Sequence, residues 1–310
     1  MTSVAAASPL FRFNVCSGKN KNGQCCMRKP YLQFPTCKHH TSISLPEPFS
    51  PTTREEWLEY KETHFNSKKP LVLELFKGTG SIDKAITRAG DMDVVSFDID
   101  KFFQPDICDD FMTFDFFNIF EPGEFFAIWS SPVCTSWSVA THKHRLPKNV
   151  CDDMKPLTEE GILGEAMILR LTEVIDYLCP LKWAIENPRG RLRNWKPFVK
   201  WLNEKDANRW TVYYGNHNHY LPKATDIWNN ANKYKYDYMT RSEKKPGSGH
   251  VFIRDISDLT LAQRYAMPSQ LCDMIASWMF KDGTHKQLMT QLTVHFALRQ
   301  ILKTDRIKLL

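Results

Sequence analysis

The stretch SSPVCTSWS, residues 130–138, places a thiol on a turn directly after the apolar run FFAIW. A structural cysteine usually lies inside a strand, where its small apolar volume helps to fill the core. A cysteine on a stiff loop, beside a proline and several hydroxyls, is instead accessible to a bound molecule, and its thiolate is a strong nucleophile. Cys134 is therefore a candidate nucleophile, with a structural thiol as the alternative.

A second chemical signal is the order of strand, glycine turn and helix in LELFKGTGSIDKAITRAG. Gly78 and Gly80 allow the backbone to approach a ligand closely. The stretch lacks the Lys-Ser ending of a phosphate-binding loop and the third glycine of a dinucleotide fingerprint, which favours a smaller ligand. Farther along, DVVSFDID ends a second predicted strand at Asp98, where a carboxylate can accept hydrogen bonds from ribose hydroxyls; Asp100 is the reserve candidate.

Further carboxylates follow predicted strands. PDICDDFMTFDFF carries Asp109, Asp110 and Asp115, and the apolar strand in LKWAIENPRGRLR ends at Glu186. A carboxylate at a strand terminus can face a ligand. Each of these acids could also cap a helix, form a turn or pair with an arginine, so the sequence leaves both interpretations open.

The first 45 residues differ from the rest of the chain in charge and in cysteine content. They contain six basic residues and no acidic one, and the remaining 35 Lys and Arg balance 35 Asp and Glu, so the formal net charge of +6 lies in this segment. A basic module most often contacts phosphate. Its cysteines and histidine could close a tetrahedral zinc site, which would supply the folding free energy that so short a segment cannot obtain from a core. The alternative is a solvated arm with free thiols.

The composition is that of an ordinary globular chain. Of 310 residues, 42% are hydrophobic and 25% are charged, which is enough for one large core or two smaller ones. No apolar run approaches the roughly 20 residues that cross a bilayer, and MTSVAAASPLFRF lacks the features of a secretory signal. We therefore expect an intracellular protein without membrane contact, in which nine cysteines favour metal binding and catalysis over disulfides.

Local patterns predict the elements that position these residues. Residues 46–69 form a Pro/Ser-rich linker and an amphipathic helix, for which Thr53 and Glu56 match a capping box. LVLELF, residues 71–76, suits a central strand of a parallel sheet. LAQRYAMPSQLCDMIASW predicts a closing turn and helix, and residues 281–310 predict a helical tail that packs rather than acts.

Taken in order, LELFKGTGS, SFDID, SSPVCTSWS, WAIENPRG, KATDIWNN and QRYAMPSQL resemble the motifs of the DNA (cytosine-5)-methyltransferases, in particular the compact enzymes of phages and large DNA viruses. The resemblance covers about residues 71–278. Pro132-Val133-Cys134 stands where the family usually has Pro-Pro-Cys, and the usual Gln-x-Arg-x-Arg element is absent. The resemblance implies a Rossmann-like, doubly wound, mostly parallel α/β sheet over residues 70–280, with a minimal target-recognition segment near residues 231–257 and the site at the carboxyl ends of the strands.

The resemblance also implies a role for each candidate residue. Cys134 would add to carbon 6 of a flipped cytosine, and Glu186 would hold the base by N3 and the exocyclic amine. The cofactor S-adenosyl-L-methionine would be bound by Phe76, Gly78, Gly80, Asp98 and Asp110. The substrate would be contacted by Ser131, Pro132, Asn187, Arg189 and Lys223.

The N-terminal segment is similar to small Cys-Cys-Cys-His modules of large DNA viruses, in which a glycine precedes the second cysteine by three positions. Gly23 stands three residues before Cys26, which favours Cys26 over Cys25. The implied zinc ligands are Cys16, Cys26, Cys37 and His40.

The activity implied is transfer of a methyl group to carbon 5 of cytosine in double-stranded DNA by a monomeric enzyme. Methylation of RNA by the same cysteine chemistry and a catalytically weak nucleic-acid-binding relic are the alternatives.

Overall fold

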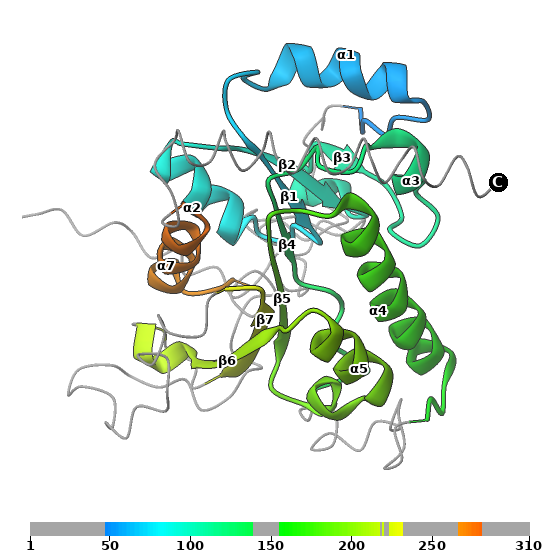
Figure 1. Ribbon diagram of the computed structural model, residues 1–310, viewed down its shortest axis with the longest axis vertical. Coiled ribbons are helices and arrows are strands. Elements are labelled where there is room, and N and C mark those ends of the chain that lie inside the picture. The colour runs from blue at the N-terminus through cyan, green and yellow to red at the C-terminus, as the bar shows by residue number, and fades with distance from the viewer. Residues whose placement is uncertain (1–46, 139–154, 218, 220–222, 232–265, 281–310) are drawn as a thin grey trace, which may run out of the picture. The chain divides into compact units, whose positions relative to one another are not determined.

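A seven-stranded sheet forms the centre of the part of the chain that the structure describes (Figure 1). The computed structural model describes residues 47–138, 155–217, 219, 223–231 and 266–280, and all of these except Ala266 belong to one unit. The strands are β1 (Leu71–Leu75), β2 (Asp93–Asp98), β3 (Ile107–Cys108), β4 (Ala127–Ser130), β5 (Lys182–Pro188), β6 (Asn208–Tyr213) and β7 (Ala224–Asn229).

The strand order is β3-β2-β1-β4-β5-β7-β6. The first five strands in this order run parallel, and β7 pairs antiparallel with both β5 and β6. From β1 the chain moves outward through β2 and β3, and then returns to place β4 on the other side of β1. The carboxyl ends of β1 and β4 therefore flank a topological switch point, which is where open α/β sheets bind ligands.

Helices cover both faces of the sheet, as the sequence predicts. They are α1 (Arg54–His64), α2 (Ser81–Ala89), α3 (Phe116–Ile119), α4 (Glu159–Leu178), α5 (Lys196–Glu204) and α7 (Ser269–Phe280), with 3₁₀ turns η1 (Lys101–Phe103), η3 (Arg191–Asn194) and η4 (Tyr214–His217). One core joins the sheet to α4 and α5, and a second joins its other face to α2 and α7 (Figure 1). Side chains alternate between the two cores: Leu73 of β1 belongs to the first and Val72 to the second. The predicted doubly wound α/β fold is confirmed.

Local signals mark the element boundaries well. Thr53 caps α1 and accepts a hydrogen bond from the Glu56 backbone N–H at 3.2 Å, as predicted, and the Glu56 carboxylate accepts from the Thr52 backbone N–H at 2.7 Å. The strand predicted over residues 71–76 ends one residue earlier, because Phe76 has a positive φ of 60° that leaves the extended conformation.

Several predictions fall outside the described residues: the N-terminal module with Cys16, Cys25, Cys26, Cys37 and His40, the tail over residues 281–310, and nearly all of residues 231–257. In the described part, Cys108, Cys134, Cys179 and Cys272 form no disulfide, and no three His, Cys, Asp or Glu side chains group as metal ligands. No helix there combines the length and apolar character that a bilayer crossing requires.

Candidate active site

The Cys134 loop follows β4 and is tied to its neighbours at both ends. Asn187, fully buried in β5, donates from Nδ2 to the Pro132 carbonyl at 3.2 Å. After the cysteine, the backbone N–H groups of Trp137 and Ser138 donate to the Cys134 carbonyl at 3.0 and 2.9 Å. The thiol is therefore carried on a fixed turn, and Asn187 lies beneath the loop that it holds.

A glycine allows the turn after β5 to approach this loop. Arg191 donates its backbone N–H to the Trp137 carbonyl at 2.8 Å, and a Cβ on Gly190 would lie 2.1 Å from the same oxygen. No side chain fits there, so the glycine of the ENPRG stretch is required for the contact between the two loops.

Glu186 lies near the end of β5 and is 6% exposed. All the hydrogen-bond donors that contact its carboxylate from described residues contact the same oxygen, Oε1. Thr225 Oγ1 donates to Oε1 in a close contact, the Tyr214 hydroxyl donates to Oε1 at 3.5 Å, and Lys223 Nζ lies 3.8 Å from it. Among the described residues, none donates to Oε2. Oε2 is therefore the oxygen left for a ligand. Sequence reasoning missed Thr225 and Tyr214, although Thr225 lies within the KATDIWNN stretch.

Cys134, Glu186 and Lys223 lie close enough to influence one another electrostatically. Burial raises the pKa of the Cys134 thiol, the Glu186 charge raises it further, and the Lys223 ammonium lowers it. The structure thus brings together three residues that sequence reasoning placed in one site. The thiol is protonated at neutral pH in the free protein, and Lys223 is the group that favours the thiolate.

The glycine loop after β1 is held by Asp98 from the neighbouring strand. Gly78 and Gly80 have positive φ angles of 52° and 63°, which the tight turn requires. The Gly78 backbone N–H donates to Asp98 Oδ2 at 2.8 Å, and that of Asp100 donates to Oδ1 at 2.9 Å. Each carboxylate oxygen can accept a second hydrogen bond, so Asp98 can hold the loop and a ligand together. The Asp100 carboxylate instead caps the turn at Phe102.

The other predicted cofactor residues lie along the same edge of the sheet. The Phe76 ring packs 4.8 Å from that of Phe111, and Asp110 Oδ1 accepts from the Met112 backbone N–H at 2.9 Å. Ile99, directly after Asp98, is 66% exposed and was not singled out from the sequence. An apolar side chain exposed at a strand terminus is the signal that could have identified it.

Ser131 joins the two halves of the site. Its backbone N–H donates to the Leu75 carbonyl at 3.3 Å, which links the end of β4 to the end of β1, and its Oγ accepts from Trp129 Nε1 at 3.0 Å. The Cys134 loop and the glycine loop thus diverge from adjacent, hydrogen-bonded strand ends.

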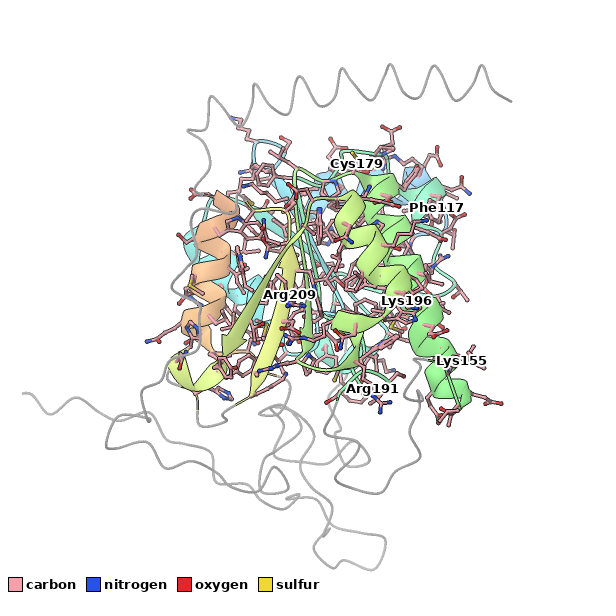
Figure 2. The ribbon with its side chains drawn as sticks, turned by 60° about the horizontal axis from the view of Figure 1, so that its bottom comes forward. Phe117, Lys155, Cys179, Arg191, Lys196 and Arg209 are labelled. Carbon is pink, nitrogen blue, oxygen red and sulfur yellow. The ribbon has the colours of Figure 1, made fainter. Side chains whose placement is uncertain are left out.

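Basic residues lie at the carboxyl ends of the strands. Arg189 Nη1 contacts the Tyr213 hydroxyl at 3.0 Å. Figure 2 shows Arg191 and Lys155 at one end of the fold, opposite Cys179 at the other end of α4. Arg191, whose backbone N–H contacts the Cys134 loop at Trp137, and the nearby Arg189 provide positive charge that suits a polyanionic ligand.

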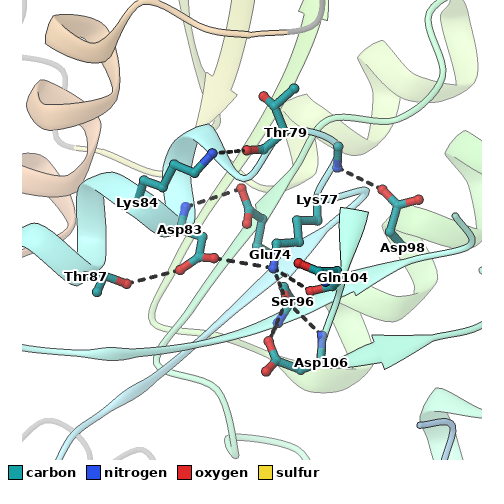
Figure 3. Close-up of polar contacts among 11 residues, drawn as sticks. Glu74, Lys77, Thr79, Asp83, Lys84, Thr87, Ser96, Asp98, Gln104 and Asp106 are labelled. Atoms are coloured by element: carbon teal, nitrogen blue, oxygen red, sulfur yellow. Dashed lines mark hydrogen bonds and ion pairs between the residues drawn. The ribbon is translucent and has the colours of Figure 1, made fainter. Parts of the chain in front are cut away.

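A buried carboxylate lies under the start of α2 (Figure 3). Glu74 of β1 accepts from the Asp83 backbone N–H at 3.4 Å through Oε1, and its Oε2 has no partner among the described residues. Burial, and then the Asp83 charge, raises the pKa of Glu74 to about 8, whereas the Lys77 ammonium opposes the rise. Glu74 is therefore mainly protonated at neutral pH.

Glu74→Gln should make stability less dependent on pH. Between the ordinary pKa of 4.5 and about 8, the folded chain holds a proton on Glu74 that the unfolded chain releases, so wild-type stability falls as the pH rises through this interval. The free energy of unfolding of the variant should exceed that of wild type at about pH 8.5, and the difference should shrink toward about pH 5. Urea unfolding at both pH values measures this; identical pH dependence in the two proteins would contradict it.

Fold and geometry together define a doubly wound α/β protein with a thiol, a carboxylate and a glycine loop at one edge of its sheet. The chain is 28% identical over 205 residues to a probable DNA (cytosine-5)-methyltransferase of Frog virus 3 (isolate Goorha), covering 59% of this chain and 86% of that protein. No family model matches the sequence.

Solved structures of methyltransferases are also similar. The Entamoeba histolytica methyltransferase EhMeth has a TM-score of 0.37 at 14% identity, covering 54% of this chain and 55% of its own. The S. pombe Dnmt2 methyltransferase has a TM-score of 0.37 at 15% identity, covering 57% and 56%. The chain spans about half the length of each of these structures.

Proposed function

We propose that the chain transfers a methyl group from S-adenosyl-L-methionine to carbon 5 of cytosine in DNA. The observation that carries the proposal is the meeting of Cys134, Glu186 and Lys223 beside the glycine loop at the carboxyl ends of the strands. The similarity to a probable DNA (cytosine-5)-methyltransferase of Frog virus 3 supports the same reaction. A nucleophile and a carboxylate with one oxygen to which no described residue donates are the two groups that this chemistry requires of the protein.

The residues at the glycine loop fit S-adenosyl-L-methionine. Asp98 and Asp110 supply acceptors for ribose hydroxyls and an adenine amine, Ile99 offers an apolar surface for the adenine ring, and a Cβ on Gly78 would have the Phe76 carbonyl oxygen as its nearest neighbour, at 3.9 Å. When bound there, the cofactor supplies an electrophilic methyl group.

The protein residues prepare the cytosine for that methyl group. Cys134 first releases its thiol proton to solvent, which the Lys223 ammonium favours. The thiolate then adds to carbon 6, which forms a carbon–sulfur bond and moves electron density to carbon 5. Glu186, with a proton on Oε2, donates that proton to N3 and so stabilises the negative charge that develops on the ring, and its carboxyl group accepts from the exocyclic amine. Carbon 5 takes the methyl group, loses its proton to a base, and the electron pair of that bond expels Cys134 as thiolate. The base must leave the duplex stack to reach the thiol, at a cost of a few kcal/mol.

Asp98→Ala should weaken binding of S-adenosyl-L-methionine by about 1–3 kcal/mol, the usual cost of removing a buried acceptor. The variant loses the ribose acceptor and also the anchor of the Gly78 backbone. Titration calorimetry measures the effect, with Asp100→Ala as the matched control. If Asp98→Ala binds normally and Asp100→Ala does not, the ribose contact belongs to Asp100.

The N-terminal module is proposed to bind one zinc ion through Cys16, Cys26, Cys37 and His40 and to add affinity for nucleic acid. Its cluster of basic charge supports this role. Metal analysis of the full-length protein should give about one equivalent of zinc, lost in Cys37→Ser. A metal-free wild-type protein would end the proposal.

The activity is tested by incubating the protein with the methyl donor and cytosine-containing DNA or RNA of matched sequence. Mass spectrometry of the released nucleosides should detect 5-methylcytosine from DNA. Product from RNA alone would replace DNA with RNA as the substrate. No product from either, across substrates of varied sequence, would leave only a nucleic-acid-binding role.

A further inference from the structure

We infer that Thr225 and Tyr214 are positioning residues that hold Glu186 by Oε1 and so direct Oε2 toward the cytosine. The inference rests on the proposed function and identifies two residues that it requires. Both donate to the same oxygen, Thr225 in a close contact and Tyr214 at 3.5 Å.

The antiparallel hairpin of β6 and β7 places both hydroxyls on the Glu186 side of the sheet. Thr225 lies in β7, opposite Pro188 of β5 and Val212 of β6. Tyr214 begins the turn after β6, and its backbone N–H donates to the Lys223 carbonyl at 2.8 Å. The hairpin backbone thus fixes the positions of the two donors relative to each other, independently of their contacts with the carboxylate.

A glutamate has three rotatable bonds, and a buried one that contacts a ligand must be held in one rotamer for efficient catalysis. Placing all described donors on Oε1 achieves this and leaves the second oxygen unengaged. Tyr214 remains a neutral donor because burial, followed by the Glu186 charge, raises its pKa well above the ordinary value. Lys223, 3.8 Å from Oε1, balances the carboxylate charge.

A purely structural role is the competing explanation, because any buried carboxylate requires hydrogen-bond donors. The two roles differ in what they change. A structural contact affects stability alone, whereas a positioning contact affects the rate of the chemical step after substrate has bound.

The test compares Thr225→Val, which removes the hydroxyl at nearly constant shape, with Thr225→Ser, which retains it. Thr225→Val should lower kcat by about 10- to 100-fold with little change in KM for DNA, and Thr225→Ser should restore most of the loss. Thr211→Val is the matched control. Thr211 lies on the opposite face of the same hairpin and donates to Asp226 at 2.8 Å, so its loss should lower thermal stability without lowering kcat.

Each outcome decides the inference. If wild type is active and Thr225→Val keeps its kcat, Thr225 is structural and the inference fails while the proposed function stands. If wild type itself makes no 5-methylcytosine on DNA or RNA, the proposed function fails first. If Thr225→Val does not fold, Tyr214→Phe serves instead, with an expected loss of about 3- to 10-fold in kcat, and an unchanged kcat would overturn the inference.

Discussion

Cys134→Ala should abolish methyl transfer, with a loss of at least about 10⁴-fold in kcat, because the variant lacks the sulfur that forms the bond to carbon 6 and so activates carbon 5. Alanine lacks the sulfur but keeps Cβ, and the loop's hydrogen bonds are accepted by the Pro132 and Cys134 carbonyls rather than by the side chain, so the loop should keep them. Binding of S-adenosyl-L-methionine and of DNA should therefore persist. Radiolabelled methyl incorporation and calorimetry measure the two properties separately.

Cys179→Ala is the matched control for loss of a thiol. Cys179 ends α4 at the opposite end of the fold from Arg191 (Figure 2), and its φ of 47° is one that alanine tolerates no worse than cysteine. This variant should retain wild-type activity. Equal losses of activity in the two variants would indicate that removal of either cysteine lowers activity. That result would contradict the role of Cys134 as the nucleophile.

Glu186→Gln should lower kcat by about 100-fold or more, the usual loss when a group that transfers or shares a proton in the transition state is removed. Glutamine keeps the length of the side chain and can still accept from Thr225. It cannot transfer a proton to N3, so the charge that develops on the ring loses its main stabilising group.

The Glu186→Gln variant can also show whether its lower activity comes from the missing carboxyl group or from a less reactive Cys134. The Glu186 charge raises the pKa of Cys134, so its removal should increase the thiolate fraction. Alkylation of Cys134 by iodoacetamide in the absence of DNA should therefore be at least as fast in Glu186→Gln as in wild type, while methyl transfer falls. Slower alkylation together with slower transfer would indicate a distorted loop.

Features that depend on short stretches of chain could be predicted from the sequence. Thr53 marks the start of a helix, Asp98 ends its strand where expected, and the glycine loop has the positive φ angles of a tight turn. Such signals are local, because capping and turn conformations are set within a few residues. The doubly wound α/β architecture is likewise consistent with the alternation of predicted strands and helices along the chain.

The contacts around Glu186 could not be predicted in the same way. Thr225 and Tyr214 reach it only because β7 lies antiparallel beside β5, and no local pattern specifies that neighbour or its register. The requirement for Gly190 is likewise visible only once Trp137 lies against it. The protonation of Glu74 at neutral pH is also not indicated by any local pattern, because it depends on burial under α2.

The most direct test of the covalent mechanism uses DNA in which 5-fluorocytosine replaces the target cytosine. Fluorine cannot leave carbon 5 as a proton does, so after methyl transfer Cys134 cannot be expelled, and protein and DNA remain joined. With S-adenosyl-L-methionine present, wild-type protein and DNA should form a complex that survives denaturation. The complex should be absent with Cys134→Ala and should form more slowly with Glu186→Gln. If the wild-type protein methylates unmodified DNA yet is released intact from the fluorinated substrate of the same sequence, the covalent role of Cys134 is contradicted.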